Sequence, residues 1–186
     1  MGCAGDIPDS LINSFALVAY LPEPLAGFVE GIGSGVQAEG GRAHVTILPP
    51  RPLCGLIENA ALELEPMAAE IAPFGVELSE VRVFPRSDVL YLSIGEGEGA
   101  LRQLHKKLSS GRLRYLEYFD YHPHVTLAQG LLLEEITRAA HKASEQWKDY
   151  AGPRRFLLDR VTLVQNTLQN QWRNLHEFHL GAPDSA

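Results

Sequence analysis

The sequence predicts a single α+β domain built from two similar halves, with two antiparallel-rich sheets facing a central cleft and helices outside. Short apolar segments with strand character alternate with amphipathic helical segments along the chain. The pattern His-Val-Thr-apolar occurs twice, at His44 and at His124, 124 − 44 = 80 residues apart. Segments 76–84 and 156–164 also align without a gap at that spacing. We therefore expect one unit used twice around a pseudo-twofold axis.

The first half alternates three strands with two helices. Segment 15–21 is a short, mostly apolar run, typical of a buried strand. Pro49 and Pro50 are expected to end the second strand, because proline cannot donate to a strand ladder. Pro66 is expected to interrupt a helix or delay its start. The predicted elements are strand 15–21, helix 23–36, strand 42–48, helix 58–72 and strand 76–84.

The second half repeats this order and adds a strand. Helix 99–110 places Leu101, Leu104 and Leu108 on one face, and helix 133–147 opens with acidic residues, as helix N-termini favour. The whole chain, 1–186, is expected to form one domain of two interleaved lobes, with flexible termini at 1–12 and 182–186. The predicted elements are strand 88–94, helix 99–110, strand 122–128, helix 133–147, strand 155–165 and strand 172–180.

Composition limits the classes of function. The chain of 186 residues is 45% hydrophobic, which argues against disorder outside its ends. A net charge of −7 argues against sequence-independent binding of duplex DNA, but it allows a local site that binds phosphate. Two cysteines and no long apolar segment predict a cytoplasmic protein with no membrane partner, and we expect a monomer.

The repeated motif carries the chemistry. Side chains at i and i+2 of a strand share a face, so His44 lies with Thr46, and His124 lies with Thr126. Imidazole titrates near neutral pH, so one histidine can act as a base while the other acts as an acid. The threonine hydroxyls can bind phosphate oxygens. This predicts displacement at phosphorus without a metal or cofactor.

Further side chains are candidates for substrate binding. Arg42 shares the face of His44 and is either a phosphate clamp or a surface arginine. His122 forms an H-x-H pair with His124 that could hold a metal with Asp120, but the duplicated motif explains His124 better, so we expect no metal and place His122 at the cleft. The aromatic residues that could stack on a base are Tyr91, Phe119, Tyr121 and Trp172, of which we choose Tyr91 and Trp172.

The segments HVTILPP and PHVTLAQG, in two α+β halves, closely resemble the two-histidine phosphoesterase superfamily, which includes the bacterial RNA 2′,5′-ligase-like cyclic phosphodiesterases. The resemblance covers about residues 13–181. It implies cofactor-free opening of 2′,3′-cyclic phosphates, with His124 as base and His44 as acid in hydrolysis. Many relatives have Ser and Tyr near Asn166 and Trp172, so substrate specificity does not carry over.

The resemblance leaves three functions open. The first is a phosphodiesterase acting on a 2′,3′-cyclic phosphate of a nucleotide or an RNA end. The second is a 2′,5′-phosphodiesterase or 2′,5′-RNA ligase using the same cleft. The third is a module that binds RNA ends or cyclic nucleotides without turnover, which would need no acid–base pair.

Overall fold

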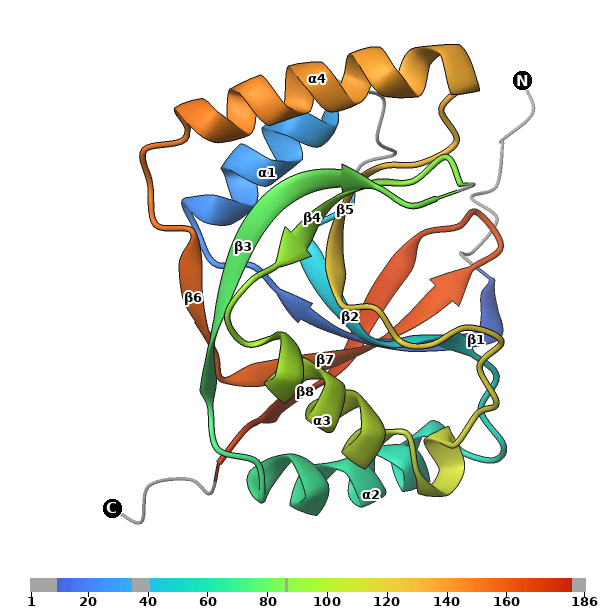
Figure 1. Ribbon diagram of the computed structural model, residues 1–186. Coiled ribbons are helices and arrows are strands. Elements are labelled where there is room, and N and C mark those ends of the chain that lie inside the picture. The colour runs from blue at the N-terminus through green and yellow to red at the C-terminus, as the bar shows by residue number, and fades with distance from the viewer. Residues whose placement is uncertain (1–9, 35–40, 86, 182–186) are drawn as a thin grey trace, which may run out of the picture.

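The computed structural model describes residues 10–34, 41–85 and 87–181 and confirms the predicted α+β class (Figure 1). Four helices and a short 3₁₀ helix alternate with eight strands within those ranges. The elements are β1 (Leu11–Tyr20), α1 (Leu25–Ser34), β2 (His44–Arg51), α2 (Ile57–Ala69), β3 (Phe74–Val83), β4 (Leu90–Ile94), α3 (Glu98–Leu108), the 3₁₀ helix η1 (Gly111–Leu113), β5 (His124–Ala128), α4 (Leu133–Asp149), β6 (Arg155–Leu158), β7 (Arg160–Thr167) and β8 (Trp172–His179).

The strands form one curled antiparallel sheet rather than the two predicted sheets. Their order is β6-β3-β4-β5-β2-β1-β7-β8. The two motif strands, β2 and β5, lie at the centre and are joined where Val45 pairs with Val125. Both valines are 0% exposed. The prediction of separate sheets was wrong because burial of these two valines brings the motif strands into direct contact.

The helices lie outside the sheet in two pairs. In Figure 1, α1 and α4 lie together at one end of the molecule, and α2 and α3 lie together at the other. Leu101, Leu104 and Leu108 of α3 are all buried, as the helical spacing predicted. They share one apolar core with Val45 and Val125. Because strand side chains alternate, the histidines and threonines of the motifs point to the opposite face of the sheet.

Several element boundaries differ from those predicted. β2 continues through Pro49 and Pro50 to Arg51, because the β1–β2 register shifts between the pairs Leu17–Leu48 and Phe15–Arg51. Prolines are tolerated where a ladder is interrupted in this way. Pro66 lies at an exposed position inside α2, so it neither delays the start of this helix nor interrupts it as predicted.

The predicted strand 155–165 is divided at Asp159 into β6 and β7. The chain changes partner there, since β6 pairs with β3 whereas β7 pairs with β1 and β8. At the N-terminus, Leu11 and Ile12 belong to β1 and not to a flexible end, with Leu11 opposite Thr167. The remaining predicted flexible residues, 1–9 and 182–186, and the end of helix 23–36 lie outside the described residues. No helix within the described ranges is long and apolar enough to cross a bilayer.

Candidate active site

The two His-Val-Thr motifs lie side by side at the centre of the sheet. β2 and β5 run antiparallel with Val45 opposite Val125. This register places His44 beside Thr126 and Thr46 beside His124, where Cβ atoms of neighbouring strands are about 5 Å apart. All four side chains point away from the buried valines and are partly or fully exposed. The structure therefore brings together the four residues predicted to be catalytic.

The two imidazoles are held in the same way. Nδ1 of His44 lies 2.7 Å from the carbonyl oxygen of Arg42, and Nδ1 of His124 lies 2.7 Å from that of His122. A carbonyl oxygen only accepts, so each Nδ1 carries the hydrogen and donates it. Nε2 of each neutral ring is then the basic nitrogen. Both rings can exchange a proton through Nε2 without losing the bond that orients them.

Burial determines how these histidines titrate. Loss of hydration lowers the pKa of His44, and the bond to the Arg42 carbonyl partly offsets this. Burial also lowers the pKa of His124, where the His122 carbonyl opposes the effect and the charges of His122 and His44 add to it. Both rings are therefore neutral near pH 7 in the free protein, and one must gain a proton before it can act as an acid. A bound phosphate would favour that proton by opposite charge.

These shifts predict a dependence of stability on pH. A histidine whose folded pKa is below its unfolded value of about 6.5 binds fewer protons in the folded state, so stability falls as pH drops below about 6.5. We expect the free energy of unfolding, measured by urea denaturation, to fall less steeply over this range in His44→Gln and His124→Gln.

His141 provides a matched control for that experiment, because its side chain is 76% exposed on α4. His141→Gln is expected to keep the slope of the unmodified protein. Equal slopes in all four proteins would contradict the stated effect of burial on the two motif histidines.

Aromatic rings surround His124. Phe84 and Tyr91 stack at 4.1 Å between centroids, and each presents an edge-on contact to His124, at 4.9 and 5.4 Å. The centroid of the His122 ring lies 5.1 Å from that of the same Phe84 ring, also in an edge-on arrangement. Tyr91 and His122 thus lie near His124 as predicted. However, Tyr91 is only 5% exposed and Phe84 covers one face of its ring, so Phe84 is the ring nearer to solvent.

Sequence analysis missed Phe84, because it reads as the last apolar residue of a strand. It also missed Tyr20, whose ring lies 6.2 Å from that of His44 in an edge-on arrangement. The Arg42 guanidinium lies 4.1 Å from the centroid of the Tyr20 ring, a cation–π contact. The Tyr20 hydroxyl donates to Oδ1 of Asn174 at 2.6 Å. Burial raises the pKa of Tyr20, against the opposing effects of Arg42 and Asn174, so the phenol stays protonated.

Trp172 lies farther from the histidines. It begins β8 opposite Asn166, and β8 is separated from β2 by β1 and β7. Its position two residues before Asn174 places it on the same face as the partner of Tyr20. The ring is 39% exposed. Trp172 therefore lies on the outer part of this face, and a direct role beside the motifs stays a prediction.

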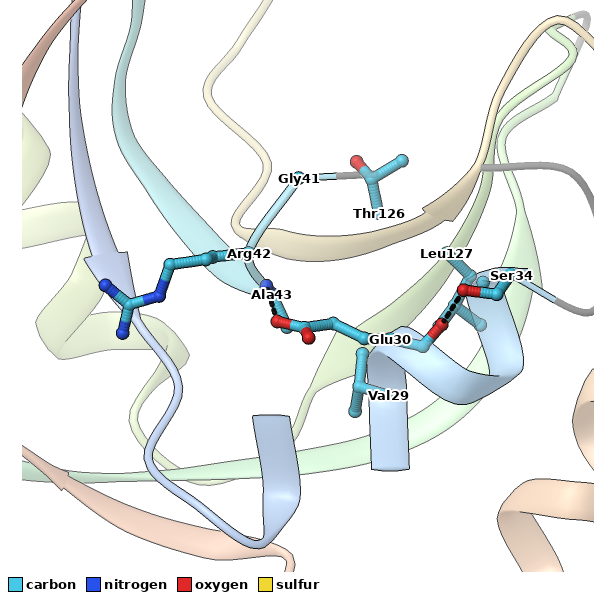
Figure 2. A pocket seen from close by; sticks show the side chains of 9 residues that line it. Val29, Glu30, Ser34, Gly41, Arg42, Ala43, Thr126 and Leu127 are labelled. Atoms are coloured by element: carbon cyan, nitrogen blue, oxygen red, sulfur yellow. Dashed lines mark hydrogen bonds between the residues drawn. The ribbon is translucent and has the colours of Figure 1, made fainter. Parts of the chain in front are cut away.

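A pocket of about 360 Å³ adjoins the motifs from the side of α1 (Figure 2). Thr126 and Arg42 lie at its border, and Glu30 lies within it, accepting a hydrogen bond from the backbone N–H of Ala43 at 2.8 Å. In Figure 2 the Arg42 side chain extends away from this pocket. The Glu30 carboxylate disfavours a phosphate there, so we place the reacting group at the histidines. The other lining residues are Val29, Gly33, Ser34, Gly41 and Leu127.

The possible metal pair, His122 and His124, has ring centroids 6.3 Å apart. In the part of the chain that the structure describes, no three His, Cys, Asp or Glu side chains gather as metal ligands would. Metal independence stays a prediction that activity in chelator can test.

A model of the 2′-5′ RNA ligase superfamily matches residues 22–170, a range that includes both motifs. The chain belongs to the 2′-5′ RNA ligase superfamily. Two proteins similar in sequence to this superfamily member are named "Putative phosphoesterase". One, from Geobacillus thermodenitrificans, is 26% identical over 77% of this chain and 85% of its own. The other, from Halalkalibacterium halodurans, is 25% identical over 74% of this chain and 83% of its own.

Solved structures show that the superfamily member shares its fold with LigT of E. coli. The complex of LigT with NADP⁺ matches with a TM-score of 0.63 and 19% identity, over 92% of this chain and 99% of LigT. The complex of LigT with 3′-AMP matches with a TM-score of 0.59 and 19% identity, over 90% and 98%. TT0787 of Thermus thermophilus matches with a TM-score of 0.59 and 19% identity, over 91% and 98%.

Proposed function

We propose that the protein is a metal-independent phosphodiesterase that opens 2′,3′-cyclic phosphates of nucleotides or RNA ends. The observation that carries the proposal is the matched pair of motif histidines. Each donates Nδ1–H to the carbonyl two residues earlier, at 2.7 Å, which leaves both Nε2 atoms for proton transfer. Hydrolysis of a phosphodiester needs one group to take a proton and another to give one.

The proposed reaction assigns these two roles to the two rings. Nε2 of His124 removes a proton from water, and the resulting oxygen attacks phosphorus. The bond from phosphorus to one ribose oxygen breaks, and protonated His44 gives its Nε2 proton to that oxygen. Thr46 and Thr126 donate hydrogen bonds to the non-bridging oxygens, where negative charge increases in the transition state. The proton taken by His124 returns to His44 through solvent, which completes the cycle.

Neighbouring side chains support substrate binding in this proposal. Arg42 is held over Tyr20 beside His44, close enough to attract the phosphate before it reaches the histidines. His122 contacts the same Phe84 ring as His124 and therefore lies beside the proposed reacting group. Tyr91 supports Phe84 from behind, and Trp172 is the candidate for more distant contacts. A small nucleotide or an RNA end fits this arrangement of a charged centre with flanking rings.

We propose that the two motifs arose by internal duplication, so that each supplies one histidine and one threonine to the same site. Strand pairs form at two places between residues 80 apart: Val45 with Val125, and Val76 with Phe156. The β1–β2 pair of Tyr20 with His44 also matches the β4–β5 pair of Ser93 with His124. These registers support the proposal that a pseudo-twofold axis relates two lobes of a single bilobal domain, with one motif in each lobe.

The relatives provide independent support for phosphoester chemistry. Those from Geobacillus and Halalkalibacterium are named as phosphoesterases, and LigT of E. coli has been crystallised with 3′-AMP, NADP⁺, ATP and phosphate. A nucleotide bearing phosphate is therefore the class of ligand to test first. A monomeric state and a cytoplasmic location remain predictions.

The family name favours one alternative, in which the same cleft acts on 2′,5′ linkages as a phosphodiesterase or RNA ligase. Comparing 2′,5′- with 3′,5′-linked dinucleotides separates this reading from the proposal. A binding module without turnover is the other alternative, and tight binding of a cyclic nucleotide without any product would favour it.

The direct test is to incubate the purified protein with a panel of 2′,3′-cyclic nucleotides in excess chelator and to resolve the 2′- and 3′-phosphate products. We expect one monophosphate isomer, formed at the same rate with and without chelator, because the histidines supply both proton transfers. The isomer identifies the oxygen that leaves. A rate that disappears in chelator and returns with a divalent cation would contradict the metal-free mechanism.

A further inference from the structure

An exposed aromatic segment lies directly before the second motif strand. It is the aromatic loop, defined as residues 114–121 between η1 and β5. Leu116 is 84% exposed, Tyr118 is 86% exposed and Phe119 is 87% exposed. Tyr118 and Phe119 are adjacent aromatic residues, and exposed apolar side chains gathered in one place can mark a binding site.

The backbone of the aromatic loop is fixed by buried polar contacts. Arg51, at 2% exposure, donates to Oε1 of Glu117 at 2.5 Å and to the carbonyl of Leu113 at 2.9 Å. The Tyr121 hydroxyl donates to the backbone carbonyl of Thr46 at 2.8 Å. The ring of Tyr121 stacks on His105 at 4.0 Å with 4° between the planes. Burial of Tyr121 raises its pKa, so the hydroxyl remains a donor at any pH at which the protein works.

Two side chains of this loop, at positions 117 and 121, are partly buried, and the others are exposed. Glu117 and Tyr121 hold it against β2, while Leu116, Tyr118 and Phe119 point to solvent. A loop held in this way keeps its exposed rings in place before any partner arrives, which reduces the entropy lost on binding. The hydrogen bond to Thr46 also ties the loop to the first catalytic motif.

The chemistry of the aromatic loop fits single-stranded RNA. Bases stack on exposed aromatic rings without regard to sequence, and a nearby cation contacts the backbone phosphates. Arg114 is exposed, and it forms no ion pair with the residues that the structure describes. The loop carries two carboxylates, of which Glu117 is paired with Arg51 and Asp120 is exposed beside Phe119. Phe119 is five residues before His124, at most about 17 Å along the chain.

From these observations we infer that Tyr118 and Phe119 bind the single-stranded RNA nucleotides that precede the reactive end. The natural substrate is then an oligoribonucleotide with a terminal cyclic phosphate rather than a mononucleotide. This inference rests on the proposed function, since it assumes that the reacting phosphate lies at His44 and His124.

The test compares the double variant Tyr118→Ala/Phe119→Ala with Leu116→Ala, which removes an equally exposed apolar side chain from the same loop. Two substrates are used: a 2′,3′-cyclic mononucleotide and a short single-stranded oligoribonucleotide ending in the same group. We expect kcat/KM for the oligonucleotide to fall about tenfold or more in the double variant, with the mononucleotide rate unchanged within about twofold. Leu116→Ala should leave both rates unchanged within about threefold.

Binding of a fluorescent, uncleavable oligoribonucleotide is measured in parallel, so that the loop can be tested even if no cyclic phosphate is hydrolysed. Weaker binding by about tenfold in the double variant would support the inference without turnover. Equal binding and equal kcat/KM in all three proteins would overturn it. So would loss of self-association, seen by sedimentation in the double variant alone with RNA affinity unchanged, because the loop would then be a contact between copies of the chain.

Discussion

Replacing His124 or His44 by alanine is expected to lower turnover of a 2′,3′-cyclic nucleotide by a factor of about 10² to 10⁴ each. Each variant removes one partner of the proton transfer, and the carbonyl that orients the ring is left without its donor at 2.7 Å. Because both side chains are partly exposed on the face away from the core, the fold should survive. The measurement is the initial rate of product formation, together with thermal unfolding.

The pH profile of kcat/KM distinguishes the two histidines. A base must be unprotonated, so its loss removes the fall in residual rate at low pH, whereas loss of the acid removes the fall at high pH. We expect the first change in His124→Ala and the second in His44→Ala. His141→Ala, on the exposed side of α4, serves as the control and should keep the full rate. Near-normal turnover in both motif variants would disprove the mechanism.

Replacing Arg51 by alanine is expected to lower the free energy of unfolding by about 3 kcal/mol. The Arg51 side chain is 1% exposed and makes hydrogen bonds to Glu117, Ser109 and two backbone carbonyls. Its removal leaves the Glu117 carboxylate and those acceptors without their donor. The value lies at the lower end for a broken buried pair, since Glu117 retains 18% exposure to water. Urea denaturation followed by circular dichroism measures the change.

A double-mutant cycle separates the ion pair from the other contacts of Arg51. If the cost comes from the uncompensated carboxylate, Glu117→Gln in the Arg51→Ala background should restore about 1 kcal/mol or more. Arg112 is the matched control, because it forms an exposed ion pair with Glu63 nearby. Arg112→Ala should cost less than about 1 kcal/mol. A similar small loss in Arg51→Ala would show that the aromatic loop is not anchored by this residue.

Local patterns were sufficient to predict most of the elements and the four motif residues. The period-two pattern of HVT placed each histidine with its threonine on one face, and the structure has both strands in that form. The sequence also predicted the buried leucine face of α3 and the acidic first turn of α4, and the structure has both. These features depend on neighbours in sequence, which is why the sequence alone predicts them.

Contacts between distant residues could not be predicted in this way. The join of β2 to β5 depends on Val45 meeting Val125, and no local pattern distinguishes one continuous sheet from two. Tyr20 joins the site because β1 pairs with β2 and sets it opposite His44, and its hydroxyl donates to Asn174, 174 − 20 = 154 residues away. Phe84 joins the site by stacking on Tyr91 across the turn from β3 to β4. Each of these contacts is created by the tertiary fold.

The strand order has a consequence for biosynthesis. β1 lies between β2 and β7, with Leu17 opposite Leu163, so one edge of an early strand waits for a partner made 163 − 17 = 146 residues later. At ordinary rates of translation this interval lasts about 7 to 30 s. An unpaired strand edge can join other chains during such a delay. The N-terminal half of the nascent chain therefore cannot complete its sheet until β7 has emerged, and the domain is expected to fold only then.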